Sequence, residues 1–186
     1  QQGLDFSGKI FLNPGDIVLC ESPTYLGAIN AFKAYEPKFI EVPTDEHGMV
    51  MEDLEDILEN NENVKFVYVI PDFQNPSGRT WSLERRKKLV ELANKYNIAI
   101  VEDNPYGELR YEGDCLPAVK HFDTEGRVIF LGTFSKIFCP GLRLGWACAD
   151  GEVLNKYILA KQGSDLQAST ISQTQVSKVF EEYDID

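Results

Sequence analysis

Apolar and polar residues follow one another along this chain in blocks that predict short strands separated by helices. Six apolar runs have the length of buried strands, and turn residues such as Gly, Pro, Asn and Asp follow most of them. We predict these strands at residues 16–21, 38–43, 65–70, 98–102, 128–131 and 144–149.

Segments with apolar residues at helical spacing lie before, between and after the strand-like runs. We predict helices at residues 4–12, 25–35, 51–59, 152–162 and 172–183, and one from Ser82 through Tyr96. Ser82 is a candidate N-cap, because its hydroxyl can accept a hydrogen bond from a free backbone N–H. The buried stripes of two helices are predicted as Leu26, Ile29, Ala31 and Phe32, and as Leu83, Leu89, Leu92, Ala93 and Tyr96.

This alternation predicts an α/β protein with three layers, a mostly parallel sheet with helices on both faces. Ligands of such sheets bind beyond the carboxyl ends of the strands. Four residues with polar side chains stand just past predicted strand ends: Tyr25, Asn75, Asp103 and Lys136. The Gly-rich dinucleotide fingerprint is absent from the sequence, which disfavours NAD as a ligand.

Composition narrows the class of protein further. A length of 186 residues is enough for one domain, and a net charge of −12 disfavours nucleic acid or an anionic membrane as a partner. No apolar run approaches the roughly 18 residues of a membrane span. The four cysteines show no paired spacing, which fits reduced thiols in a cytoplasmic protein, and Cys20 is predicted to be buried. The two histidines have no partners at metal-ligand spacing, so we expect no metal site.

The segment after the fifth predicted strand carries the most informative chemistry. Thr133, Ser135, Lys136 and Arg143 lie within eleven positions. A lysine just beyond a buried strand is poorly placed for a solvated charge and well placed for a reactive amine. Hydroxyls and a guanidinium suit a phosphate group. An amine beside a phosphate site indicates a phosphorylated aldehyde, and pyridoxal phosphate is the commonest such cofactor. We also predict Trp146 in the core.

Two other strand ends supply what this cofactor requires. Asp103 ends the fourth predicted strand, and a carboxylate there would pair with the protonated ring nitrogen. Asn75 follows the third strand and Tyr106 follows Asp103. Both side chains can donate hydrogen bonds to an ionised phenolic oxygen.

The order of these motifs resembles a known family. Asn75-Pro76-Ser77-Gly78, then Asp103 with Tyr106, then Ser135-Lys136 with Gly141 to Trp146 are similar to class I/II aminotransferases of PLP fold type I. The sequence from Pro71 to Gly78 most resembles that of the 2-aminoadipate and kynurenine aminotransferase branch. The resemblance covers essentially the whole chain.

The resemblance implies a role for each matching residue. Lys136 would bind the cofactor's aldehyde and move the substrate proton, and Asp103 would hold the ring nitrogen. Tyr25 would stack on the ring, and Gln1 would be the end of a Gly-Ser-Gln turn at a helix N-terminus that faces the phosphate. The remaining contacts would come from Asn75 and Tyr106 to the phenolic oxygen, and from Thr133, Ser135 and Arg143 to the phosphate.

The resemblance also implies the activity and the partners. An amino group would pass between an amino acid and a 2-oxo acid, with 2-oxoglutarate as acceptor and a hydrophobic, aromatic or 2-aminoadipate-type donor. A homodimer would have its site at the subunit interface, where Ser169 and Thr170 could reach the neighbouring subunit.

Family members extend further at both ends than this sequence, which begins inside a functional motif. We therefore expect a fragment, with residues 1–160 in a large cofactor-binding domain and residues 161–186 leading to a small domain. That domain would supply the arginine for the substrate's α-carboxylate. We expect the chain by itself not to transaminate at a useful rate.

Two alternative functions share these motifs. One is the amino-acid-sensing domain of a transcription regulator, which would have a winged helix upstream. The sequence around Asn75 favours the enzyme over the regulator. The other is a lyase or decarboxylase on the same fold, which product analysis would distinguish. A binding module without catalysis fits least, because the lysine is intact.

Overall fold

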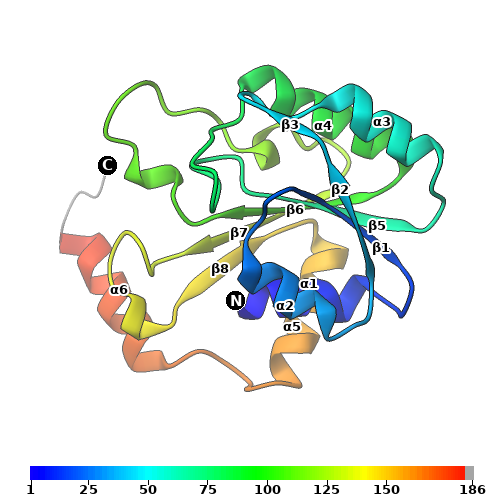
Figure 1. Cartoon of the computed structure of the whole chain (residues 1–186). Coiled ribbons are helices and arrows are strands. Elements are labelled where there is room, and N and C mark those ends of the chain that lie inside the picture. The colour runs from blue at the N-terminus through cyan, green and yellow to red at the C-terminus, as the bar shows by residue number, and fades with distance from the viewer. Residues whose placement is uncertain (183–186) are drawn as a thin grey trace.

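The computed structural model describes residues 1–182 and consists of one large sheet between two layers of helices (Figure 1). The sheet has six strands in the order β2-β1-β5-β6-β7-β8. Their bounds are β1 Ile17–Glu21, β2 Lys38–Val42, β5 Val64–Val69, β6 Ala99–Asn104, β7 Val128–Thr133 and β8 Gly145–Cys148. A separate hairpin consists of β3 Thr44–Asp45 and β4 Gly48–Met49.

Six α-helices accompany the strands within the described residues. Their bounds are α1 Gln2–Phe11, α2 Leu26–Lys33, α3 Met51–Glu59, α4 Leu83–Tyr96, α5 Gly151–Gln162 and α6 Thr170–Glu182. Short 3₁₀ turns lie at η1 Gly107–Leu109, η2 Val119–Phe122 and η3 Pro140–Leu142. Helices α3 and α4 cover one face of the sheet, and α1, α2 and α5 cover the other (Figure 1).

The first five strands of the sheet order run parallel, and β8 runs antiparallel to β7 at the edge. Parallel strands buried on both faces read as continuous apolar runs. Both β1 and β5 show this, because four or more residues of each are buried. The predicted α/β class and three-layer arrangement are confirmed.

Two apolar cores fill the spaces above and below the sheet. Leu54, Leu89 and Leu92 belong to the core on the α3–α4 face, and Phe32 and Phe66 to the core on the α1–α2 face. Phe32 and Phe66 meet edge to face with their ring centroids 5.1 Å apart. Each of the four central strands, β1, β5, β6 and β7, contributes buried residues to both cores.

Most of the predicted local details are confirmed. Ser82 caps α4, because its hydroxyl accepts a hydrogen bond from the Arg85 N–H at 3.3 Å. Cys20 is buried in β1. The hairpin β3–β4 and the antiparallel direction of β8 were not predicted. The last position of the predicted helix 172–183 lies outside the described residues.

Three predicted core residues are wrong. Leu26 is 68% exposed and Leu83 is 37% exposed, because each is the first residue of its helix and lies outside the buried part of the helix face. Trp146 is 41% exposed on the edge strand β8. Its ring lies against Gly132, where an added Cβ would come within 2.2 Å of Trp146 Cε2. An edge strand has a neighbour on one side, so half of this indole stays in solvent.

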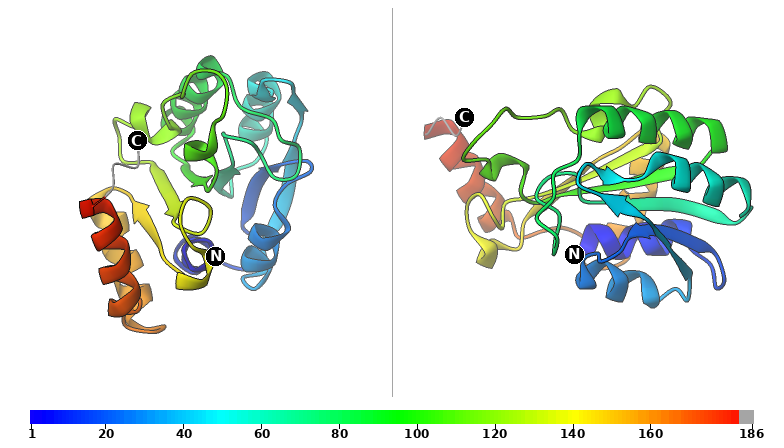
Figure 2. Two further views of the ribbon diagram at one scale, coloured as in Figure 1. Left: turned by 90° about the vertical axis from the view of Figure 1, so that its left-hand side faces the viewer. Right: turned by 45° about the horizontal axis from the view of Figure 1, so that its top comes forward.

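Helix α6 stands beside the β7–β8 edge of the sheet (Figure 2). Phe180 on α6 meets Phe134, the residue after β7, with ring centroids 5.6 Å apart. Phe134 in turn lies 4.8 Å from the Trp146 ring. None of the helices described within residues 1–182 is long and apolar enough to cross a membrane.

Replacing Leu54 by Ala is expected to lower the free energy of unfolding by about 2–5 kcal/mol, because Leu54 is fully buried between α3 and the sheet. Leu26→Ala is the matched control and should change it by less than about 0.5 kcal/mol. Urea unfolding of both variants measures the two values. Equal losses would contradict the assignment of the core.

Candidate active site

The predicted site residues follow the carboxyl ends of four neighbouring parallel strands. Tyr25 follows β1, Asn75 follows β5, Asp103 lies near the end of β6, and Lys136 follows β7. Since these strands are adjacent in the order β1-β5-β6-β7, their loops meet at one edge of the sheet. The structure therefore brings together segments that are more than 100 residues apart in sequence.

Asp103 is a partly buried carboxylate near the end of β6. Its carboxylate accepts a hydrogen bond from the Tyr68 hydroxyl, with 2.9 Å between Tyr68 Oη and Asp103 Oδ2. Burial raises the pKa of Asp103 above its usual value, and the Tyr68 bond opposes that rise. A carboxylate in this situation gains stability when a cation is placed against it.

Sequence reasoning missed Tyr68, which lies on β5 and is fully buried. Burial is the main cause that raises the pKa of this phenol well above its usual value, and Asp103 adds to the rise. Tyr68 therefore stays a hydrogen-bond donor toward Asp103. A signal was present in the sequence, because a tyrosine within an apolar strand needs a partner for its hydroxyl.

Asn75, Tyr106 and Lys136 lie close together on three different loops. Asn75 Nδ2 donates a long hydrogen bond to Tyr106 Oη at 3.5 Å. Lys136 Nζ is 5.9 Å from the centroid of the Tyr106 ring. An amide, a phenol and an amine thus face one another at the carboxyl ends of β5, β6 and β7.

Gln1 links this group to Arg143 and to the start of α2. The charges of Asp103 and Arg143 both act on the backbone nitrogen of Gln1. Both charged side chains therefore lie near the beginning of α1. Gln1 Nε2 donates to the Gly27 carbonyl at 2.7 Å. The Tyr25 ring also lies against Gly27, where an added Cβ would come within 2.4 Å of Tyr25 Cζ.

Thr133, Ser135 and Arg143 shape the loop between β7 and β8. Thr133 Oγ1 donates to the Leu144 carbonyl at 3.3 Å and accepts from the Ser135 N–H at 3.1 Å. Arg143 has a left-handed backbone with φ of 53°, and its guanidinium donates to the Pro140 carbonyl at 3.0 Å. These bonds hold the turn that carries Lys136.

One expectation for this loop is wrong. The position of Lys136 after a buried strand predicted an amine sheltered from solvent, but Lys136 and Arg143 are both exposed. The physical reason is the place of the loop, which connects the last two strands at the edge of the sheet. The cationic side of the site is therefore exposed, whereas Asp103 on the acidic side is partly buried.

Gln74 and Glu21 are two further buried polar residues that were not predicted from the sequence, and their hydrogen bonds connect the site loops. Gln74 Nε2 donates to the Pro23 carbonyl at 2.9 Å, which joins the loop of Asn75 to the loop of Tyr25. Trp81 Nε1 donates to Glu21 Oε1 at 3.0 Å. Burial raises the pKa of Glu21 to about 7, although the Trp81 bond opposes this. Glu21 ends β1, where the sequence showed an acidic residue after an apolar run.

A hollow of about 640 Å³ lies at the opposite edge of the sheet. It is lined by residues at the amino ends of the strands, among them Val64, Ile98 and Arg127. None of the predicted site residues contributes to it. Because parallel sheets bind ligands at the carboxyl ends of their strands, we assign the candidate site to the loops around Asp103.

Fold, strand-end residues and sequence together define the class of the protein. Residues 2–185 match the family "Aminotransferase class I and II". The chain belongs to this family.

Particular relatives are similar over nearly the whole chain. Aromatic-amino-acid aminotransferase 1 of Thermococcus litoralis is 52% identical, with 97% of this chain and 44% of the relative covered. Kynurenine aminotransferase of Pyrococcus horikoshii, solved in complex with PMP, is 48% identical with a TM-score of 0.94 and coverage of 97% and 46%. An α-aminoadipate aminotransferase of Thermus thermophilus, complexed with N-(5'-phosphopyridoxyl)-L-leucine, is 40% identical with a TM-score of 0.91 and coverage of 97% and 47%. The chain thus spans less than half the length of these relatives.

The high pKa of Glu21 generates a prediction for stability against pH. A carboxyl whose pKa rises from 4.5 to about 7 on folding makes the protein less stable as pH rises between these values. Glu21→Gln keeps an acceptor for Trp81 and removes this titration. We expect the variant to be more stable than the parent at pH 8, by up to about 3 kcal/mol, and to match it more closely at pH 4.5.

Urea unfolding at the two pH values measures this difference. Glu46→Gln, an exposed carboxylate on the β3–β4 turn, is the control and should leave the difference between the two pH values unchanged. A Glu21→Gln variant with the same pH dependence as the parent would refute the titration of Glu21.

Proposed function

We propose that this chain provides the cofactor-binding part of an aminotransferase, with pyridoxal phosphate held between the loops after β5, β6 and β7. The observation that carries the proposal is the grouping of Lys136, Tyr106 and Asn75 at the carboxyl ends of the strands, where partly buried Asp103 lies near the end of β6. Membership of the aminotransferase class I and II family supports it, as does the phosphopyridoxyl group in the Thermus relative.

The residues fit the groups of this cofactor. Asp103, partly buried and with a raised pKa, suits the cationic ring nitrogen, because an adjacent cation favours its ionised form. The Asn75 amide and the Tyr106 hydroxyl can donate to the phenolic oxygen. The Tyr25 ring is proposed to stack on the cofactor ring.

The phosphate is proposed to bind between the start of α1 and the loop of Arg143. The first N–H groups of a helix and its dipole favour an anion, and Gln1 stands at this position. Arg143 supplies a guanidinium nearby. Thr133 and Ser135 offer hydroxyl groups on the same loop.

When bound, the cofactor supplies an electron sink for the negative charge that develops at the substrate Cα. Lys136 would anchor the cofactor through its amine and, once displaced by the substrate, would move the proton from Cα. Asp103 would keep the proton on the ring nitrogen. Tyr68 would hold Asp103 in place through its hydroxyl.

Substrates, assembly and location follow as further parts of the proposal. We propose an amino acid with a hydrophobic, aromatic or 2-aminoadipate side chain as donor and 2-oxoglutarate as acceptor, in a cytoplasmic homodimer. The names of the relatives, which include aromatic-amino-acid, kynurenine and α-aminoadipate aminotransferases, support this donor range. Residues 1–160 are proposed as the large domain, and the exposed segment around Ser169 and Thr170 as a contact with the second subunit.

Lys136→Ala should abolish the visible absorbance that pyridoxal phosphate shows when it is bound to a lysine amine. Lys88→Ala, an exposed lysine on α4, is the matched control and should keep the band. Absorption spectra of both variants, made in the longest natural chain that contains these residues, test the role. An unchanged spectrum for Lys136→Ala would remove Lys136 from it.

Asp103→Asn should lower kcat by about 10- to 1000-fold and affect cofactor affinity less. An adjacent carboxylate shifts the pKa of a cation by about 1–3 units, and each unit corresponds to tenfold. Steady-state kinetics with an amino acid and 2-oxoglutarate, beside cofactor titration, measure the two effects in the longest natural chain that contains these residues. A normal kcat would contradict the pairing of Asp103 with the ring nitrogen.

A further inference from the structure

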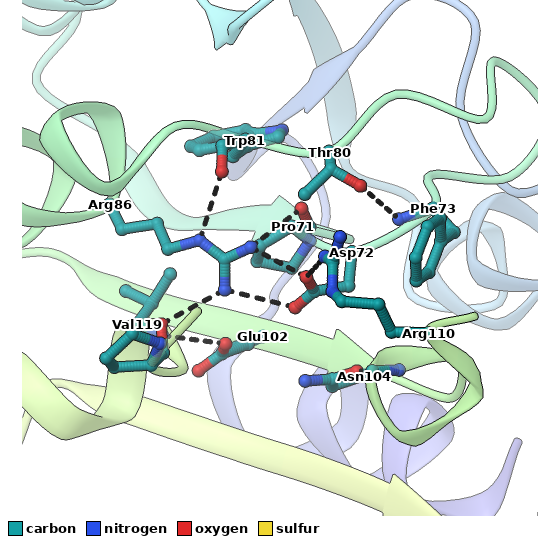
Figure 3. A network of polar contacts seen from close by, with 12 residues as sticks. Pro71, Asp72, Phe73, Thr80, Trp81, Arg86, Glu102, Asn104, Arg110 and Val119 are labelled. Carbon is teal, nitrogen blue, oxygen red and sulfur yellow. Dashed lines mark hydrogen bonds and ion pairs between the residues drawn. The ribbon is translucent and has the colours of Figure 1, made fainter. Parts of the chain in front are cut away.

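A buried arginine holds both ends of the loop that carries Asn75. Arg86 on α4 is fully buried, and its guanidinium forms five hydrogen bonds (Figure 3). Two of them go to the carboxylate of Asp72, at 2.8 and 3.0 Å. The others go to the carbonyls of Pro71 at 3.2 Å, Trp81 at 3.3 Å and Pro117 at 3.0 Å. Arg86 therefore binds the loop between β5 and α4 near both of its ends, at residues 71 and 81.

A second arginine reaches the same carboxylate from the loop of Tyr106. Arg110 Nη2 donates to Asp72 Oδ1 at 3.2 Å (Figure 3). Its guanidinium also lies over the Phe73 ring, with Arg110 Cζ 4.7 Å from the ring centroid. Phe73 has a left-handed backbone with φ of 50°, which is uncommon for a bulky residue. Arg110 thus contacts the strained beginning of the Asn75 loop at two adjacent residues.

The two contacts lie next to the proposed donors for the phenolic oxygen. Asp72 is three residues before Asn75, and Arg110 is four residues after Tyr106. The donors themselves are 3.5 Å apart across the two loops. The bridge from Asp72 to Arg110 therefore joins the two segments whose spacing sets that distance.

The second arginine is not needed to neutralise Asp72, because Arg86 already binds that carboxylate with two hydrogen bonds. Arg110 loses hydration on entering this site, with a side chain only 13% exposed, and its Nε is buried without a hydrogen-bond partner among the described residues. A buried ion pair with such a cost is weak evidence for a stabilising role. The contact of Arg110 with Asp72 is therefore better explained by its effect on the geometry of the two loops.

We propose that Arg110 is a positioning residue, which holds the Tyr106 loop against the Asn75 loop so that both side chains converge on one acceptor oxygen. The inference rests on the proposed function, because that acceptor is the phenolic oxygen of the cofactor. Arg110 touches neither the cofactor nor the substrate in this proposal.

The test replaces Arg110 by Met, which keeps the length of the side chain and removes the guanidinium. Arg79→Met is the matched control, because Arg79 lies on the Asn75 loop and donates instead to Thr44, away from Asp72. Both variants are made in the longest natural chain that contains these residues and are loaded with pyridoxal phosphate. The measurement is the pH midpoint at which the visible band of the bound cofactor changes.

We expect the midpoint to rise by about 0.5 to 1 pH unit in Arg110→Met, which corresponds to the free energy of one lost hydrogen bond. The midpoint should stay unchanged in Arg79→Met. When the donors separate, more negative charge stays on the phenolic oxygen. The Lys136 nitrogen, which would join the cofactor beside that oxygen, then holds its proton more tightly. Arg110→Lys, which keeps a charge that can reach Asp72, should give a smaller rise. Equal midpoints for the parent and Arg110→Met would overturn the proposal.

A crystal structure of Arg110→Met without cofactor separates this proposal from the proposed function. We expect the distance from Asn75 Nδ2 to Tyr106 Oη to exceed the present 3.5 Å, whether or not the parent binds the cofactor. An unchanged distance would overturn the positioning role. A parent without any visible band would instead refute the proposed function. If Arg110→Met does not fold, the same two measurements on Arg110→Lys decide the question.

Discussion

The common direction of β1, β5, β6 and β7 is the constraint on which the rest of this structure depends. Parallel pairing places the carboxyl ends of these strands at one edge of the sheet. Each strand then delivers its following loop to the same region, regardless of how far apart the loops are in sequence. Were β6 or β7 alone reversed, Asp103 and Lys136 would lie at opposite ends of the strands.

Parallel pairing brings the loops to the same edge but does not fix their shapes. Their backbones lie outside the sheet ladders, so buried side chains supply the missing hydrogen bonds. Glu102 accepts from the N–H groups of Val119 and Lys120 at 2.8 Å each (Figure 3 shows the bond to Val119). Burial is the main cause that raises the pKa of Glu102 to about 7. Together with Arg86 and Glu21, this carboxyl ties the loops to the rigid layers beneath them.

The site therefore has two sides of different physical character. Tyr68 belongs to the apolar core, and it donates a hydrogen bond to Asp103, which lies partly buried near the end of β6. Lys136 and Arg143 lie on the exposed loop between β7 and β8. A rigid carboxylate and a more accessible amine are suited to a reaction in which one group stays in place and the other exchanges partners.

The sequence by itself determined the α/β class and the six main strands, and it indicated the strand-end segments where the proposed site lies, because apolar periodicity and strand-end chemistry are local properties. It also indicated Ser82 as a cap, since a cap needs only its own helix. Tertiary structure alone decided that Trp146 lies half in solvent on an edge strand and that Lys136 is exposed. It also decided that Tyr68 faces Asp103 and that Asp72 meets two arginines. These features depend on which strands become neighbours and which strand lies at the edge of the sheet. Contacts between residues far apart in sequence determine that arrangement, and such contacts form only when the chain folds.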